Sequence, residues 1–128
     1  MGSLEYDVQE VAKRFDRYSN FAVDISARLG DIALQDTATV RQFFLNYQGR
    51  ILFGTDIVSP PSMAALPDER RTAVLKNYHA NYDRHFQYLQ TDDTFELYGH
   101  QVKGIGLPAE VVEKVCYTNA VRWYPGIA

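Results

Sequence analysis

Two short apolar runs constrain the fold of this chain more than any other feature of its sequence. Residues 20–26 read Asn-Phe-Ala-Val-Asp-Ile-Ser, and residues 50–55 read Arg-Ile-Leu-Phe-Gly-Thr. Both runs are typical of strands that are buried on most sides, as in a parallel sheet. A helical pattern precedes each run, at residues 7–18 and again between Asp36 and Gly49. Because helix, strand, helix and strand alternate, the sequence predicts an α/β fold built on a parallel sheet.

Polar residues and prolines mark the ends of the expected helices. Asp7, with Glu10 three residues later, favours a capping box, and Asp36 is expected to cap the second helix. Pro108 is placed to open a last helix at a permitted first-turn position. Residues 95–98 predict a short extended piece. Residues 68–90 predict one long helix or two consecutive ones, with a core face formed by Val74, Tyr78, Tyr82, Phe86 and Leu89.

Composition excludes several classes of protein. The 128 residues fit one domain, residues 1–128, and 46% of them are hydrophobic, which is enough for a core. The net charge of −3 and the lack of a basic stripe argue against nucleic-acid binding. Apolar runs are too short for a membrane span, and the acidic start is no signal peptide, so a cytoplasmic protein is expected. The single Cys116 excludes an internal disulfide and favours a buried, inert thiol.

Two carboxylates, Asp24 and Asp56, lie near the carboxyl ends of the two predicted strands. In parallel α/β folds these ends and the loops after them form the active face. Arg28 follows the first strand closely and could hold a substrate carboxylate, but a structural ion pair explains it equally well. Helix capping or a satisfied hydrogen-bond network accounts for Asp56 about as often as catalysis does. The residues alone therefore leave both interpretations open.

Three segments, taken in order, carry a resemblance to a known family. They are "GSLEYDVQEVAKRFDRYSNFAVDISARL", "RQFFLNYQGRILFGTD" and "GIGLPAEVVEKVCYTNAVRWYP". Together they resemble the C-terminal part of the amidohydrolase-related metal-dependent hydrolases, the branch with amidohydrolase-2 type enzymes and aminocarboxymuconate-semialdehyde decarboxylase-like lyases. The resemblance covers nearly all of the chain and is loosest over residues 57–100. It implies a partial (β/α)8 TIM barrel, of which this chain forms the last strands and the C-terminal helices.

The resemblance also implies a chemistry. Asp56, at the end of the eighth barrel strand, would bind a divalent metal ion, most often zinc, or accept a proton during catalysis. Asp24 and Arg28 would bind the small-molecule substrate. The complete family enzyme would hydrolyse C–N or ester bonds, with nonoxidative decarboxylation as the main alternative.

Departures from the family pattern limit this expectation. The family's His-x-His pair and the histidine of its fifth strand have no counterpart here, and His79, His85 and His100 are poor candidates for metal ligands. A barrel of this kind needs roughly 250 residues. The chain is therefore expected to be a C-terminal fragment, inactive and without bound metal when alone. The resemblance further places a histidine directly before Met1.

A second hypothesis assigns this chain a role without catalysis, as a stand-alone α/β module that works as a homo-oligomer or as the partner of a separate chain. Two parallel strands cannot cover both faces and both edges by themselves. Self-association is therefore expected, with aromatic contacts from Tyr47, Tyr78, Tyr82, Tyr88 and Trp123.

Overall fold

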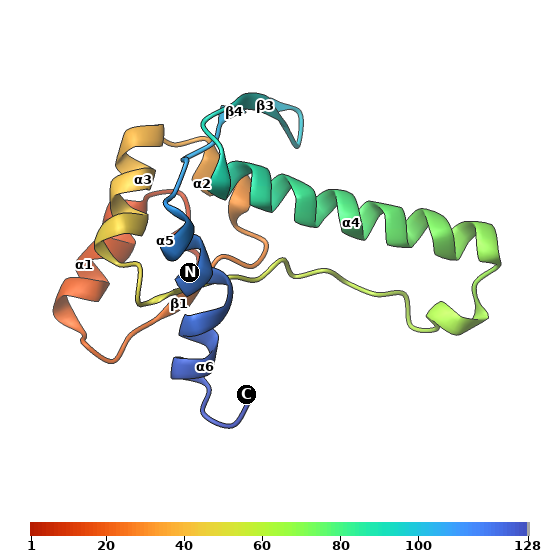
Figure 1. Ribbon diagram of the computed structural model, residues 1–128, viewed down its shortest axis with the longest axis horizontal. Helices are drawn as coiled ribbons and strands as arrows, with labels where there is room; N and C mark the ends of the chain where they lie inside the picture. Colours follow the sequence, from red (N-terminus) through yellow and green to blue (C-terminus); the bar gives the residue numbers. More distant parts are fainter. Residues whose placement is uncertain (128) are drawn as a thin grey trace.

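The computed structural model describes residues 1–127. Within them, β1 (Val23–Asp24) and β2 (Ile51–Leu52) form a parallel pair, with Val23 opposite Ile51 and Asp24 opposite Leu52. Helix α1 (Val8–Arg17) precedes β1, whereas α2 (Leu29–Ala33) and α3 (Thr37–Asn46) connect β1 to β2 (Figure 1). The order of elements agrees with the predicted α/β class. Both strands are shorter than the apolar runs that predicted them.

Side-chain caps begin the two predicted N-terminal helices. The carboxylate of Asp7 accepts a hydrogen bond from the Gln9 backbone N–H at 2.9 Å, and that of Asp36 accepts one from the Thr39 N–H at 2.8 Å. Both caps confirm the sequence interpretation. The carboxylate of Glu10 does not complete a capping box, because it pairs with Lys13 and Arg14 on the same helix.

The core lies between α1, α3, the parallel strands and the C-terminal helices. Phe15 of α1 stacks on Phe43 of α3 with ring centroids 5.8 Å apart. The Arg50 guanidinium lies 4.6 Å from the Phe15 ring centroid and donates to the Phe15 carbonyl at 2.8 Å. The apolar residues that α1 buries are those expected from its helical spacing, namely Val8, Val11, Ala12 and Phe15.

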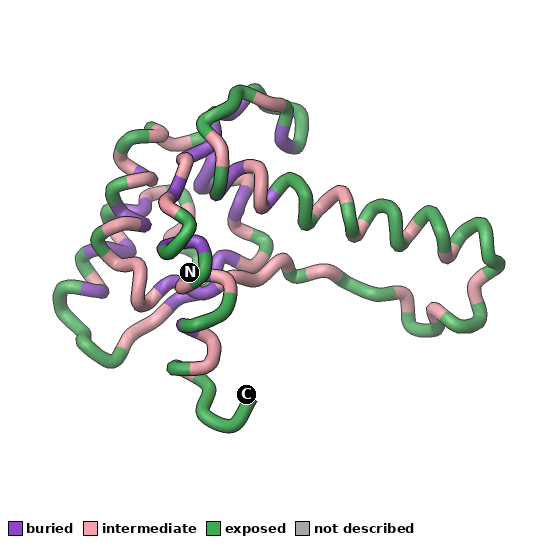
Figure 2. The backbone as a smooth tube through the Cα atoms, viewed as in Figure 1, coloured by how far each residue is buried: buried purple, intermediate pink, exposed green. Residues whose placement is uncertain are grey.

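Helix α4 (Asp68–Gln90) matches the predicted range but only part of the predicted core face. Figure 1 shows it projecting from the body as an arm, with the segment that follows β2 and the short helix η1 (Met63–Ala65) running beside it. Burial increases only toward its C-terminal end (Figure 2). There the helix buries His85, Tyr88 and Leu89. Of the predicted core face, Leu89 is buried, Val74, Tyr78 and Phe86 are half-buried, and Tyr82 is exposed. The prediction therefore holds fully only where the helix meets the body, because the rest of it projects outward.

An antiparallel hairpin follows α4. It consists of β3 (Thr94–Leu97) and β4 (His100–Lys103), with Leu97 opposite His100. Tyr98 and Gly99 form the turn, and both have positive φ angles, of 51° and 86°. Such angles are typical of tight two-residue hairpin turns. The expected extended piece is thus the first strand of a hairpin. The sequence did not predict the second strand, β4.

The chain closes with α5 (Ala109–Glu113), a π-helical turn η2 (Lys114–Thr118) and α6 (Asn119–Trp123). Pro108 is the N-cap residue of α5, one position before the expected first turn. In the widened turn the Asn119 N–H bonds to the Lys114 carbonyl, while the Val115 carbonyl accepts the Phe53 N–H at 2.8 Å. The π turn thereby joins the C-terminal helices to the residue that follows β2.

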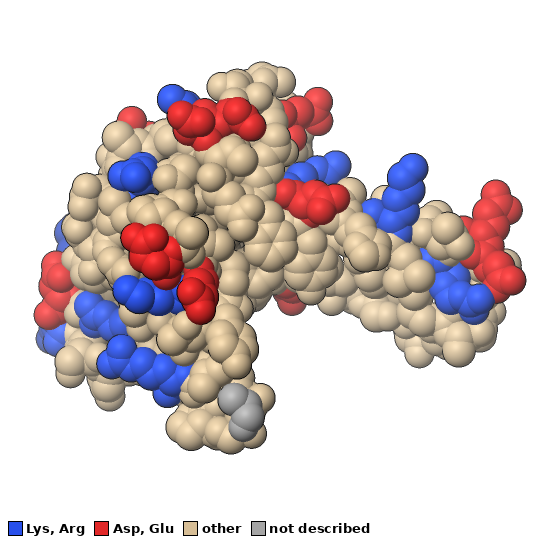
Figure 3. Space-filling model, viewed as in Figure 1, with Lys and Arg blue, Asp and Glu red and all other residues tan. Residues whose placement is uncertain are grey.

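The surface carries charged side chains of both signs, as the composition suggested. On the face shown in Figure 3, acidic and basic side chains occur side by side over the body and the arm. In the described part of the chain, no helix has the length and apolar character needed to cross a membrane.

Cys116 is half-buried, and burial raises the pKa of its thiol, which disfavours the reactive thiolate.

Candidate functional site

The carboxyl ends of β1 and β2 lie side by side, as the parallel pairing requires. Ser26 follows β1 and Gly54 follows β2. A Cβ added to Gly54 would lie 2.0 Å from the Ser26 hydroxyl oxygen. The glycine of the Gly-Thr-Asp segment therefore lets the two loops approach each other closely.

Asp24 is the better organised of the two predicted site carboxylates. Its side chain accepts a hydrogen bond from the Ser26 backbone N–H at 2.9 Å. Partial burial acts to raise its pKa, but hydrogen bonds from the Ser26 hydroxyl and N–H outweigh burial and lower the pKa below its ordinary value. The N-terminal ammonium group of Met1 also donates to the Asp24 carbonyl at 3.0 Å. Asp24 is thus a charged, oriented acceptor at neutral pH.

Asp56 occupies an exposed position in the loop after β2. Its φ angle of 55° lies in the left-handed region, which aspartate tolerates better than most residues with a side chain. Among residues 1–127 its carboxylate forms no ion pair with a lysine or arginine. The side chain is therefore available to a ligand, in the loop that follows the last residue of β2, Leu52.

Arg28 forms an ion pair with Glu5, at 3.2 Å between guanidinium and carboxylate. This geometry corresponds to the structural ion pair that the sequence left open. About a third of the Arg28 side chain remains exposed, at 36%. Its role in substrate binding stays a prediction.

Histidines do not gather around either carboxylate. Within residues 1–127, no group of three or more histidine, cysteine, aspartate or glutamate side chains is arranged to hold a metal ion. His79 and His100 are exposed, whereas His85 is buried in α4. A zinc site typically takes about three protein ligands and a water molecule. The described residues therefore provide at most part of such a site.

A sequence model of the family described as amidohydrolase matches residues 4–126. The chain belongs to the amidohydrolase family. This membership confirms the resemblance seen in the three sequence segments. No curated protein and no solved structure matches the chain.

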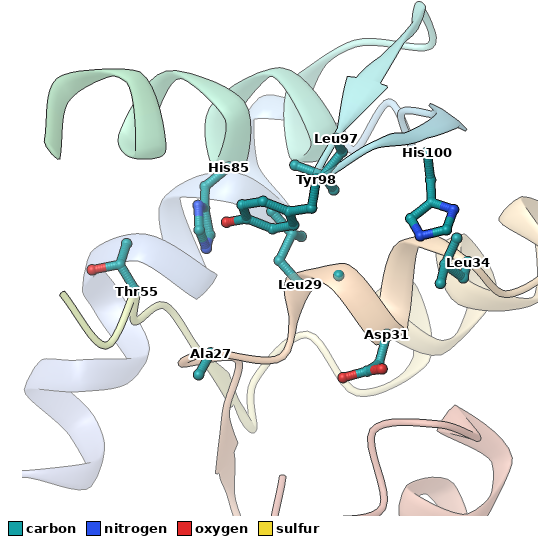
Figure 4. Close-up of a pocket in the computed structure, with 10 residues that line it drawn as sticks. Ala27, Leu29, Asp31, Leu34, Thr55, His85, Leu97, Tyr98 and His100 are labelled. Atoms are coloured by element: carbon teal, nitrogen blue, oxygen red, sulfur yellow. The ribbon is translucent and has the colours of Figure 1, made fainter. Parts of the chain in front are cut away.

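The amidohydrolase chain also has a cavity that the sequence did not predict. Its volume is about 380 Å³, and it lies between α2, the C-terminal part of α4, the hairpin and Thr55 of the Gly-Thr-Asp segment (Figure 4). His85 lines it and is 1% exposed. The helical period could have indicated this burial, since His85 lies four residues before Leu89 and therefore on the same face.

Proposed function

We propose that this chain supplies the last strands and C-terminal helices of a metal-dependent amidohydrolase barrel. The complete enzyme would hydrolyse C–N or ester bonds of a small molecule, with decarboxylation as the related alternative. The observation that carries this proposal is the family match over residues 4–126, in which Gly54-Thr55-Asp56 follows a parallel strand at its carboxyl end. The helical connection between β1 and β2 is the repeating unit of such barrels and supports the same reading.

The residues present do not fit a complete metal centre. Asp56 offers one free carboxylate at the carboxyl end of β2, and the described histidines do not converge on it. We propose that Asp56 contributes one metal ligand or accepts a proton. Under this proposal the remaining ligands come from residues outside the 128 of this chain. The chain alone is then inactive.

The chain's own residues can orient a substrate at this edge. Asp24 is held in one orientation by Ser26 and can accept a hydrogen bond from a substrate donor. Arg28 can release Glu5 or share it, because the pair is partly exposed, and can then hold a substrate carboxylate. Both roles rest on placement near the carboxyl end of β1.

The test is reconstitution with a polypeptide that carries the six missing barrel strands. The mixture should bind about one zinc ion per complex and hydrolyse a C–N or ester substrate panel, whereas this chain alone should do neither. Asp56→Asn should remove both properties. Asp83→Asn, which neutralises an exposed aspartate on α4, is the matched control and should keep them. Stoichiometric zinc in the chain alone, unaffected by Asp56→Asn, would contradict the proposal.

A second candidate function is association without catalysis, as a homo-oligomer. The observation in its favour is the projecting α4 and the segment beside it, in which Val58, Leu75 and Tyr82 are 82%, 44% and 41% exposed. Of the aromatic residues expected at such an interface, Tyr88 is excluded, because it is 1% exposed in the core. Sedimentation equilibrium of the chain without metal tests this candidate. A compact monomer at tens of micromolar would exclude it.

A further inference from the structure

The buried His85 has one ring nitrogen satisfied and one free. Its Nδ1 lies 2.8 Å from the backbone carbonyl oxygen of Asn81, one helical turn earlier in α4. Because a carbonyl oxygen only accepts hydrogen bonds, Nδ1 carries the proton and the lone pair is on Nε2 in the neutral ring. Nε2 is buried and has no hydrogen-bond partner among residues 1–127. Burial lowers the pKa of His85, which favours this neutral form at pH 7. Such unpaired buried acceptors are rare in folded proteins.

Asn81 positions a second side chain at the same place. The Tyr98 hydroxyl, from the hairpin turn, donates to the Asn81 side-chain oxygen at 2.8 Å. The Tyr98 ring also lies against α2, since a Cβ added to Gly30 would be 3.4 Å from it. In Figure 4 the His85 imidazole extends from α4 into the space between Thr55 and Tyr98, and the Tyr98 ring lies beside it. Asn81 thus positions two side chains: that of His85, which carries the unpaired acceptor, and that of Tyr98, which covers it.

The cavity around these residues has the size and polarity of a small-molecule site. Its volume of about 380 Å³ falls in the range of roughly 300–1,000 Å³ typical of ligand pockets. Leu29, Leu34 and Leu97 form an apolar wall, and Thr55 also lines the cavity. Among the described residues no lysine or arginine lines the cavity, whereas the acidic residue Asp31 does. This charge distribution disfavours an anionic ligand.

We propose that this cavity binds a small uncharged molecule whose hydroxyl or amide N–H group donates a hydrogen bond to Nε2 of His85. The apolar part of the molecule would lie against the leucine side chains, with Tyr98 covering it. The site goes beyond the proposed function, because it requires neither a metal ion nor catalysis. It adjoins the Gly-Thr-Asp loop through Thr55.

Four benzene derivatives of similar size test the proposal on the full chain. Benzyl alcohol and benzamide carry a donor, toluene lacks one, and benzoate carries a negative charge. The readout is the ¹⁵N resonance of His85 Nε2 in long-range proton–nitrogen NMR spectra. We expect both donors to move this resonance toward the value of a protonated nitrogen in a saturable way, and toluene and benzoate to leave it unchanged. If neither donor moves it, or if benzoate binds as tightly as benzamide, the proposal is wrong.

Variants locate the binding. His85→Phe keeps a ring of similar size without the acceptor and should weaken benzyl alcohol binding about tenfold, the effect of one hydrogen bond to a buried group. Tyr98→Leu removes the partly exposed cover and should also weaken it. Tyr117→Leu changes another exposed tyrosine, 63% exposed against 52% for Tyr98, which lies outside the cavity, and should leave binding unchanged. Equal binding by wild type and Tyr98→Leu, together with an unchanged Nε2 resonance, would place the ligand elsewhere and overturn the proposal.

Discussion

Asn119 of α6 donates a hydrogen bond from its side-chain amide to the carbonyl oxygen of Ile51 in β2, at 2.7 Å. The same amide group donates to the Gln48 carbonyl at 2.6 Å. Asn119 is only 3% exposed, and its bond to Ile51 is buried, whereas the bond to Gln48 is partly buried. Asn119 therefore anchors α6 to β2, the strand that precedes Asp56, through a hydrogen bond.

Replacing Asn119 should lower stability because it leaves the carbonyl group of Ile51 unpaired in a buried position. We expect Asn119→Ala to lower the free energy of unfolding by about 2 kcal/mol, from two lost hydrogen bonds, of which the one to Ile51 is buried. Urea unfolding followed by circular dichroism measures the change. Asn20→Ala, at an exposed position before β1, is the control and should have little effect. A change below about 1 kcal/mol for Asn119→Ala would show that the anchor is unimportant.

Gly104 should tolerate no side chain. A Cβ there would lie 2.2 Å from the Thr91 carbonyl oxygen, and backbone cannot move aside as a flexible side chain can. We expect Gly104→Ala to destabilise the chain by about 3 kcal/mol through overpacking between the end of α4 and the segment after the hairpin. Thermal unfolding provides the measurement. Gly49→Ala is the matched control, since its Cβ would make ordinary contact at 3.6 Å with Arg122. Equal melting temperatures for the two variants would refute this prediction.

His85 should make stability depend on pH below neutrality. Its pKa in the folded state is lowered by burial from the ordinary value of 6.5. Above that value the ring is neutral in both states and contributes nothing. As the pH falls below it, the unfolded chain takes up a proton that the folded chain resists, so stability is lost until the folded-state pKa is reached. Tyr98, Asp31 and His100 line the same cavity and are present in every variant compared.

Comparison of variants isolates this contribution. Between pH 7.5 and 5.5 the free energy of unfolding should fall more for wild type than for His85→Phe, which cannot titrate. His79→Gln changes an exposed histidine of the same helix and should behave like wild type. An identical pH dependence for wild type and His85→Phe would mean that burial does not shift this group.

The left-handed backbone conformation at Asp56 should lower the free energy of unfolding for any residue there that has a side chain. Its φ of 55° suits glycine, whereas a Cβ in the left-handed region costs roughly 1–2 kcal/mol. We expect Asp56→Gly to be more stable than Asp56→Ala by about 1 kcal/mol. Chemical denaturation of the two variants gives this difference directly. Asp83→Gly and Asp83→Ala, within helix α4, should show the opposite order, because glycine weakens a helix interior. The same order at both positions would contradict the role given to φ.

Local features of the sequence determined most of the secondary structure. Helix spacing, the caps at Asp7 and Asp36, and the two apolar runs predicted α1, α3, β1 and β2, because these signals depend on neighbours a few residues apart. The full range of α4 was predicted for the same reason. The three ordered segments were also enough to identify the amidohydrolase family.

Tertiary structure alone decided which faces are buried and which polar groups meet. The aromatic stripe of α4 has helical spacing, but most of the helix projects from the body, so its burial could not be read from period alone. Arg28 meets Glu5 and Asn81 meets Tyr98 across 23 and 17 residues. Such contacts depend on how distant segments pack, and no local propensity encodes them. For the same physical reason the cavity beside His85 exists only in the folded chain, where α2, α4, the hairpin and Thr55 come together around it.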